Sequence, residues 1–410
     1  MAKVMISLLG TGRLAKGDTE KNEYETTDYR FDDGSVYEEE TFSSSALIKH
    51  FGIERVYFVG TAQSMWDNVA QKYGMTDDEV LALLERKEHG ILDEKDLVKL
   101  GEAIDKKLVS KGSRCFVVRE GENEEQLWAI FSKFMEILEE LDAEDEVYID
   151  ITHLFRSVSI MTFVMAEMGK VLHGLKQCRL FYAMYKKNEP SQIVELTLFF
   201  ELLDWSRAVR NLRDYGNGFD LLALVAESGA GKEVENPIAD FTYALSLSSM
   251  ASLQRSVKVI KGKLETFEKS HHKIIPLVAK ELRHFVERLS IEDTARFQFE
   301  LAHWYAENKN YAMAYITLVE AAITAECQNL GLNDALEQDR NQAKKSLYDR
   351  IDWNKNTKED QKIGKAFKKT NDIRKNIAHK LPSEATKTNI TPKHGVENFE
   401  IYWKDLAKLL

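Results

Sequence analysis

The strongest constraint on the fold is a change of pattern near residue 198. Before it, short apolar runs typical of strands alternate with segments of helical period, whereas the rest of the chain shows helical period alone. Such alternation is typical of a Rossmann-like, doubly wound α/β domain with a largely parallel sheet. We therefore expect an α/β domain over residues 1–197 and an all-α domain over residues 198–410.

The first domain is expected to contain a series of strands, two of them paired around an Asp-Gly turn. They cover Val4–Leu9, Tyr24–Phe31, Val36–Phe42, Arg55–Val59, Arg114–Val118, Glu146–Ile151, Arg179–Tyr185 and Ile193–Leu198. Helical patterns fall between them at 43–51, 96–110, 123–140 and 155–173.

The second domain is expected to be helical throughout. The clearest segments are Glu201–Tyr215, Pro237–Phe267, Lys273–Leu289, Thr294–Asn308 and Tyr311–Asn329, followed by two more. Asn310-Tyr311 is expected to begin a long, buried, alanine-rich helix.

Composition indicates an ordinary folded protein. Of the 410 residues, 44% are hydrophobic and 30% are charged, which is typical of globular domains. The three cysteines, Cys115, Cys178 and Cys327, are far apart and odd in number, which favours reduced thiols. No apolar run is long enough for a membrane span, and the N-terminus enters a strand pattern without a signal-peptide pattern. We expect a cytoplasmic protein with no membrane partner.

Polar or glycine-rich residues follow several of the expected strands. Doubly wound sheets bind ligands beyond the carboxyl ends of their strands. Two of these ends read Gly10-Thr11-Gly12-Arg13 and Gly60-Thr61-Ala62-Gln63. Glycine lets the backbone approach an anion closely, so we favour an anion-binding loop at Gly10–Arg13 over a plain tight turn.

The same glycines match the dinucleotide fingerprint G-x-G-x-x-A in form, over Gly10–Ala15. That fingerprint should open a helix. A charged stretch and a hairpin pattern follow here instead, so a nicotinamide dehydrogenase is a distant alternative.

A third strand end reads Asp150-Ile151-Thr152-His153-Leu154-Phe155-Arg156-Ser157 and opens a helix pattern. Thr152 is expected to be the N-cap, and the helix N-terminus with His153 and Arg156 is expected to attract phosphate. Capping alone, with Asp150 orienting the turn, is the alternative.

Two other motifs are expected to have no chemical role. Glu227–Glu233 resembles a phosphate-binding loop only superficially, because Glu233 stands where that loop needs Ser or Thr, and we expect a helix–helix loop. His271, His272 and His284 lack a metal-ligand spacing and are expected to be exposed helix histidines. We expect no metal.

The chain is acidic overall, with a net charge of −11, but residues 340–380 hold 13 Lys and Arg against 5 acidic residues. This run is either a phosphate-facing surface or a solvated helix face. It contains Arg374-Lys375-Asn376-Ile377-Ala378-His379. RNA carries its own nucleophile, the 2′-OH. A histidine that moves a proton and an arginine that stabilises the phosphate therefore suffice for metal-free cleavage to 2′,3′-cyclic phosphate ends.

Several segments together resemble a known family. Ile6–Gly12, Tyr24–Phe31, Val59–Trp66 and Asp150–Ser157 are similar to the CARF domain of CRISPR-associated proteins. Arg374 and His379 resemble the R-x(4–6)-H motif of HEPN ribonucleases. The order, CARF then HEPN, resembles a type III CRISPR accessory ribonuclease. Many HEPN motifs place Asn directly after Arg. Here Lys375 follows and Asn376 comes second, so Asn376 is a catalytic candidate of open role.

The resemblance implies an allosteric endoribonuclease of antiviral defence. A CARF dimer would bind a cyclic oligoadenylate, with cyclic tetra-adenylate the favoured ring, and activate a HEPN dimer that cuts single-stranded RNA. The ring would contact the three loops Gly10–Arg13, Gly60–Gln63 and Thr152–Ser157. Ring size, RNA sequence preference and self-cleavage of the activator stay open.

Helix geometry adds an independent argument for a dimer. Residues five positions apart differ by roughly 140° around a helix, so one helix does not easily aim Arg374 and His379 at one point. Two copies facing each other across a two-fold axis could share a composite site. The alternatives are a cyclic-nucleotide sensor that does not cut RNA and a standalone enzyme that degrades the cyclic nucleotide.

Overall fold

The computed structural model describes residues 1–410 except 14–23, 187–188, 355 and 380–390. The chain divides into two compact units, Met1–Glu201 and Leu202–Leu410. We describe each unit by itself.

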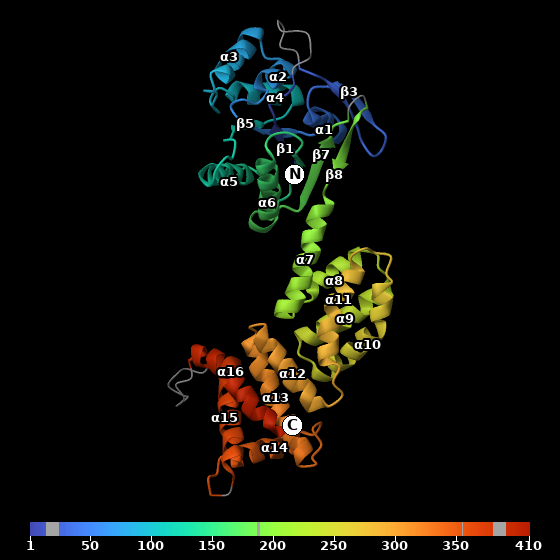
Figure 1. The fold of residues 1–410 in the computed structure, drawn as a ribbon, viewed down its shortest axis with the longest axis vertical. Helices are drawn as coiled ribbons and strands as arrows, with labels where there is room; N and C mark the ends of the chain where they lie inside the picture. The colour runs from blue at the N-terminus through green and yellow to red at the C-terminus, as the bar shows by residue number, and fades with distance from the viewer. Residues whose placement is uncertain (14–23, 187–188, 355, 380–390) are drawn as a thin grey trace. The chain divides into compact units, whose positions relative to one another are not determined.

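In the described part of the first unit, eight strands form one sheet in the order β3-β2-β8-β7-β6-β1-β4-β5. Figure 1 shows the neighbouring strands β7 and β8 of this sheet. Their bounds are β1 Lys3–Leu9, β2 Thr27–Arg30, β3 Val36–Glu40, β4 Arg55–Gly60, β5 Arg114–Val117, β6 Glu146–Asp150, β7 Gln177–Met184 and β8 Ser191–Glu195. The strands from β7 to β5 in this order are parallel, whereas β2–β3 and β7–β8 are antiparallel. This confirms the doubly wound, largely parallel sheet.

Helices cover both faces of the sheet. They are α1 Ser43–Phe51, α2 Trp66–Lys72, α3 Asp77–Glu88, α4 Val98–Leu108, α5 Glu124–Glu139 and α6 Arg156–Leu172. Along β1, Met5 and Leu9 face the core that includes α1, α2 and α4, while Val4, Ile6 and Leu8 face α5 and α6. Burial on both faces explains why β1 is continuously apolar rather than alternating.

The chain order of the strands places a topological switch at β1. β4 lies on one side of β1 and β6 on the other, so the crossovers run in opposite directions from this strand. Ligands of doubly wound folds bind in the crevice at such a point, beyond the carboxyl ends of the strands. The loops after β1 and β6 are therefore the part of the sheet best placed to hold a ligand.

The second unit is helical in its described part and shares one hydrophobic core. The helices are α7 Leu198–Tyr215, α8 Phe219–Glu227, α9 Lys232–Ser246, α10 Met250–Glu268, α11 Ile275–Leu289, α12 Thr294–Glu307, α13 Tyr311–Asn329, α14 Glu337–Asp349, α15 Lys358–His379 and α16 Pro392–Leu406. The short 3-10 helix η1 spans Ala407–Leu409. The expected alanine-rich helix is confirmed as α13, which Asn310 caps by accepting a hydrogen bond from the Met313 amide.

Three expectations about the elements are wrong. The single helix expected over Pro237–Phe267 is two helices, because the chain reverses at Ser248, whose backbone is left-handed at φ 49°. The last expected strand ends at Glu195, and Leu198 already belongs to α7. His271 and His272 lie in a bend before α11 rather than on a helix.

Candidate functional site

The loop after β1 is shaped by two glycines. The Met65 amide donates a hydrogen bond of 2.9 Å to the Gly10 carbonyl, and a Cβ at Gly10 would lie 3.3 Å from the Cβ of His153. Gly12 has φ +74°, and a Cβ there would lie 2.5 Å from the Tyr24 ring. Only glycine fits this backbone and this contact. Gly10–Arg13 therefore lies against the loop after β6, as the strand-end argument predicts.

A buried ionic cluster holds Tyr24 beside that loop. The Tyr24 hydroxyl donates to the Asp67 carboxylate at 2.9 Å, and the Lys87 ammonium donates to both Tyr24 and Asp67. Burial, followed by the Asp67 charge, raises the pKa of Tyr24 far above its usual value. The cluster therefore ties the Gly12 turn to α2 and α3 in a fixed protonation state.

The loop after β4 is mainly structural. Thr61 is buried; its amide donates to the Ser64 hydroxyl and its carbonyl accepts from the Trp66 indole. A Cβ at Gly60 would lie 2.7 Å from the Ser64 hydroxyl oxygen, which explains that glycine. Ala62 is half-buried, and Gln63 is exposed and donates to the Lys87 carbonyl.

The loop after β6 is organised by a buried carboxylate. Asp150 is fully buried and accepts hydrogen bonds from the Ser43 hydroxyl at 2.7 Å and from the Thr152 amide at 3.0 Å. The Thr152 hydroxyl donates to Asp150 and accepts from the Ala183 amide, which links the loop to β7. Asp150 thus orients the turn, which is one part of the alternative interpretation of this motif.

The expectation that Thr152 caps α6 is wrong. Phe155 occupies the N-cap position without a capping side chain, because the Thr152 hydroxyl is already used between Asp150 and β7. Leu154 has φ 75°, so the chain turns sharply before the helix begins. The first amides of α6 are thus left without a side-chain cap, which makes this helix end attractive to an anion.

Charged and aromatic side chains stand at the same edge of the sheet. Arg156, the first residue of α6, is exposed and forms no ion pair with a described residue. The Arg13 guanidinium lies 5.1 Å from the centre of the Tyr185 ring, just past the end of β7. Ser157 is half-buried and lies close to Gly121 in the loop after β5. Cations and an aromatic face suit phosphates and purine bases.

His153 is the half-buried histidine of this edge. Its Nε2 atom has no hydrogen-bond partner among the described residues. Burial lowers the pKa of His153 below its usual value, and the charge of Asp150 acts in the opposite direction. The neutral imidazole is therefore the form that packs against Gly10.

This burial predicts a pH-dependent stability. In the unfolded chain the imidazole of His153 is protonated near pH 6.5, whereas in the folded unit its pKa is lower and it stays neutral at that pH. Lowering the pH through this value should therefore destabilise the α/β unit. The loss should accumulate between the pKa of the unfolded chain and the lower pKa of folded His153, and it should stop below the latter. Urea unfolding of the wild type and of His153→Gln at neutral and mildly acidic pH measures it. An identical acid loss in both proteins would contradict the assignment.

The proposed catalytic residues lie at the end of α15. Arg374 is half-buried, and its guanidinium forms no hydrogen bond or ion pair with a described residue. Lys375 is exposed and Asn376 is half-buried. His379 is the last residue of α15, but its side chain lies outside the described residues.

A buried polar layer lies one turn before Arg374. Thr370 and Asn371 are fully buried, and Asn371 donates to the Tyr348 hydroxyl at 2.6 Å. The Thr370 hydroxyl and the Asn371 carbonyl oxygen have no partner among the described residues. At helical period these two residues share the inner side of α15 with Arg374.

Two further motifs of the sequence lie in the helical unit. Glu227–Glu233 is the connection between α8 and α9, as predicted. His272 lies against the Trp205 ring, and in the part of the chain that the structure describes no cluster of His, Cys, Asp or Glu could hold a metal. Within the same residues, no helix is long and apolar enough to cross a membrane.

Sequence reasoning missed the groups that support the loops. Tyr24, Asp67 and Lys87 are far apart in the chain, and nothing in their spacing links them. Asp150 could be suspected from its place at the end of β6, but its partners Ser7 and Ser43 could not. Tyr185 follows a strand and could have been found as a further strand-end residue.

Two protein-family models match the chain, one over the first unit and one over the start of the second. Residues 4–188 match the family model of the CARF domain of the CRISPR system endoribonuclease Csx1. Residues 201–293 match the model of the second domain of CRISPR-associated protein MJ1674. MJ1674 of Methanocaldococcus jannaschii is 29% identical over 348 residues, which is 80% of this chain and 54% of that protein. The chain therefore spans about half the length of this curated relative.

A solved structure is also similar. Enterococcus italicus Csm6 bound to cyclic hexa-2′-fluoro-hexa-dAMP aligns over 100% of this chain and 93% of its own, with a TM-score of 0.41 and 12% identity. The match to the CARF family model agrees with the doubly wound fold of the first unit. The chain is a CARF-containing protein of the CRISPR-associated group.

Proposed function

We propose that the chain is a cyclic oligoadenylate-activated, metal-independent endoribonuclease of type III CRISPR defence. The CARF loops bind the activator. Arg13 and Arg156 lie at the switch point of the sheet without a carboxylate partner among the described residues, and the uncapped N-terminus of α6 adds free amides. These groups suit the phosphates of a cyclic nucleotide, and Tyr185 suits an adenine.

The observation that carries the catalytic half is the unpaired Arg374. Arg374 is half-buried, and its guanidinium has no carboxylate partner among the described residues. A phosphate would supply the missing charge. We infer that His379 takes the proton of the RNA 2′-OH while the 2′-oxygen attacks phosphorus. The bond to the 5′-oxygen then breaks, that oxygen takes up a proton, and Arg374 stabilises the crowded phosphate.

The surface of α15 supports contact with RNA. Lys358, Lys362, Lys365 and Lys369 recur at helical spacing, are all exposed and form no ion pair with a described residue. A row of unpaired cations attracts a phosphate backbone without regard to base sequence. Single-stranded RNA is therefore the proposed substrate.

The proposed enzyme is a homodimer. Ile160, Val164 and Val171 lie on one side of α6 and are exposed by 66%, 45% and 70%. Contiguous exposed apolar side chains mark an interaction surface. We infer that a second copy covers this face, because helix positions five residues apart, such as those of Arg374 and His379, differ by roughly 140° in azimuth, and a composite site needs both copies.

A charge on this face should separate the copies. Ile160→Glu is expected to yield a monomer that has lost RNA cleavage by about 100-fold or more, since an ionised side chain cannot be buried unpaired in an apolar interface. Light scattering and a cleavage assay measure the two effects. Val98→Glu, at an exposed apolar position at the start of α4, is the matched control. A monomeric Ile160→Glu protein of full activity would rule out the composite site.

The experiment that tests the proposal is RNA cleavage in EDTA, with and without cyclic oligoadenylates. Cleavage that depends on the ring and withstands EDTA supports it. Binding of the ring without cleavage would instead indicate a sensor, and loss of the ring without RNA cleavage would indicate an enzyme that degrades the cyclic nucleotide.

A further inference from the structure

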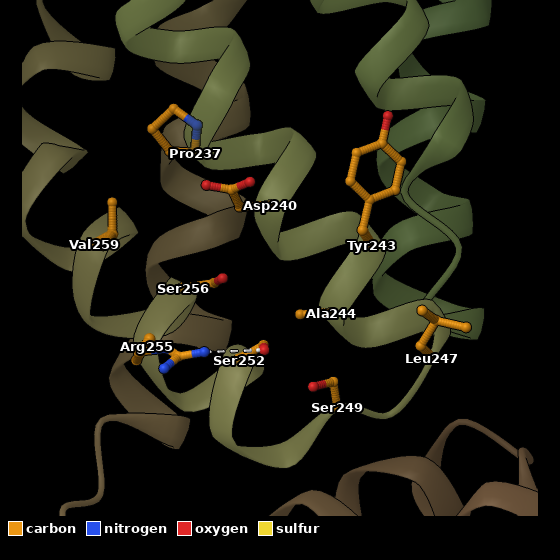
Figure 2. A pocket seen from close by; sticks show the side chains of 10 residues that line it. All are labelled: Pro237, Asp240, Tyr243, Ala244, Leu247, Ser249, Ser252, Arg255, Ser256 and Val259. Atoms are coloured by element: carbon orange, nitrogen blue, oxygen red, sulfur yellow. Dashed lines mark hydrogen bonds between the residues drawn. The ribbon is translucent and has the colours of Figure 1, made fainter.

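A groove between α9 and α10 belongs neither to the CARF loops nor to α15. It encloses about 410 Å³, a size within the range of small-molecule sites, about 300–1,000 Å³ (Figure 2). It is lined by Pro237, Asp240, Tyr243, Ala244, Leu247, Ser249, Ser252, Arg255, Ser256 and Val259. All of these lie within the region that matches the second domain of MJ1674.

One end of the groove is suited to an anion. Arg255 is exposed, donates to the Ser252 hydroxyl at 3.2 Å and forms no ion pair with a described residue. Ser249 occupies the N-cap position of α10, but its side chain forms no capping hydrogen bond. The first intrahelical bond runs from the Leu253 amide to the Ser249 carbonyl, so the amides before Leu253 point out of the helix without a partner. A guanidinium, two hydroxyls and free amides thus converge there.

A largely buried serine whose hydroxyl opens onto the groove gives an independent indication of a ligand. Ser256 is only 7% exposed and lines the groove, and Figure 2 shows its hydroxyl directed into the space between the two helices. The hydroxyl has no hydrogen-bond partner among the described residues. The hydroxyl oxygen itself is not enclosed, so it can be reached from the groove and can exchange a hydrogen bond with a polar group of a ligand there.

The other end of the groove offers different chemistry. Asp240 projects from α9 and forms no ion pair with a described residue. Tyr243, one turn further along α9, is 52% exposed and presents its ring beside the groove. Val259 adds apolar surface on the α10 side. A carboxylate accepts hydrogen bonds from sugar hydroxyls, and an aromatic ring stacks on a base.

We propose that this groove binds a nucleotide unit carrying one phosphate. The phosphate lies at Arg255, Ser252 and the N-terminus of α10, the sugar hydroxyls meet Ser256 and Asp240, and the base lies against Tyr243. The same chemistry is present in a free nucleoside monophosphate and in one residue of a single RNA strand. The proposal does not depend on the ribonuclease activity.

The test is equilibrium binding to the full-length protein. The probes are AMP, adenosine, inorganic phosphate and a linear hexa-uridylate, each titrated into the wild type and four variants. Losing a charge-assisted contact costs about tenfold in affinity or more. AMP should therefore bind at least tenfold more tightly than adenosine, and Arg255→Ala should remove about that factor, whereas Ser256→Ala should remove less. Lys261→Ala, at an exposed cation on α10 outside the groove, should change nothing.

The variant pattern decides the outcome. AMP binding that Arg255→Ala weakens and Arg156→Ala leaves unchanged supports the groove with a free nucleotide as its ligand. If hexa-uridylate alone shows this dependence on Arg255, the nucleotide belongs to an RNA strand. Binding that follows Arg156 and ignores Arg255 places the nucleotide at the CARF loops and overturns the proposal, as does the failure of every probe to bind.

Discussion

Replacing His379 by alanine is expected to abolish RNA cleavage while leaving the affinity for the cyclic activator unchanged. Loss of a general acid–base group lowers a rate by about 10²–10⁴-fold. Arg374→Ala should have an effect of similar size, because it removes the cation that stabilises the phosphate as charge builds up. Initial rates at saturating activator, together with calorimetric titration of the ring, measure both quantities.

The matched control lies on the same helix. Lys369 is an exposed cation of α15, so Lys369→Ala should weaken RNA binding modestly and leave the maximal rate near that of the wild type. A His379→Ala protein that still cleaves RNA at the wild-type rate would exclude His379 from the reaction. Loss of ring binding in that variant would contradict the proposal that RNA and the ring bind at two separate sites, since a change in the RNA site would then have abolished ring binding.

Replacing Arg156 by alanine should have the opposite pattern. Arg156 is exposed at the uncapped start of α6, where the switch point of the sheet places a ligand. Loss of its contact to a phosphate should lower the affinity for the ring by about 10–100-fold. The concentration of activator needed for half-maximal cleavage should rise by the same factor, with the rate at saturation preserved. Titrating RNA cleavage against ring concentration measures the shift.

Arg30→Ala is the control for Arg156→Ala. Arg30 is exposed at the end of β2, which runs antiparallel to β1 through its pairing with β8, so it lies at the opposite edge of the sheet. Its removal should leave the activation curve unchanged. If Arg156→Ala also left the curve unchanged, the ring could not bind at the N-terminus of α6. If both variants shifted it equally, the effect of Arg156 would be one of net charge.

Much of the first unit follows from the sequence because each of its signals is local. The apolar run of β1, the Asp-Gly hairpin between β2 and β3, and the glycines after β1 each act within a few residues. Chain order and the rule of strand ends then place Gly10 beside His153, which is the contact observed.

The supports of the site depend on distant residues and were not predictable. Thr152 has every property of an N-cap, but tertiary contacts with Asp150 and Ala183 take its hydroxyl. Tyr24 contacts Asp67 and Lys87, which are 43 and 63 positions away in the chain, so only the tertiary fold brings them together. In the helical unit, the chain reverses at Ser248 where a continuous helix was expected. The break could not be predicted, because the four residues 246–249 are Ser and Leu and carry no strong helix-stop signal.

The proposed catalytic pair was also predictable only in part. The spacing of Arg374 and His379 is evident in the sequence, and the sequence places both in one helix-prone stretch. What it could not give is that Arg374 lacks a carboxylate partner among the described residues and lies one turn beyond the buried Thr370 and Asn371. The absence of a partner among the described residues is a property of the folded unit, since one acidic residue, Asp372, stands only two positions from Arg374 in the chain.

The most direct test of the account is cleavage of a labelled single-stranded RNA in excess EDTA, with cyclic tetra-adenylate, cyclic hexa-adenylate or no ring. The account predicts no cleavage without a ring, rapid cleavage with one of the two, no effect of EDTA, and products that end in 2′,3′-cyclic phosphate. Cleavage that is independent of the ring, or that EDTA abolishes, would contradict it.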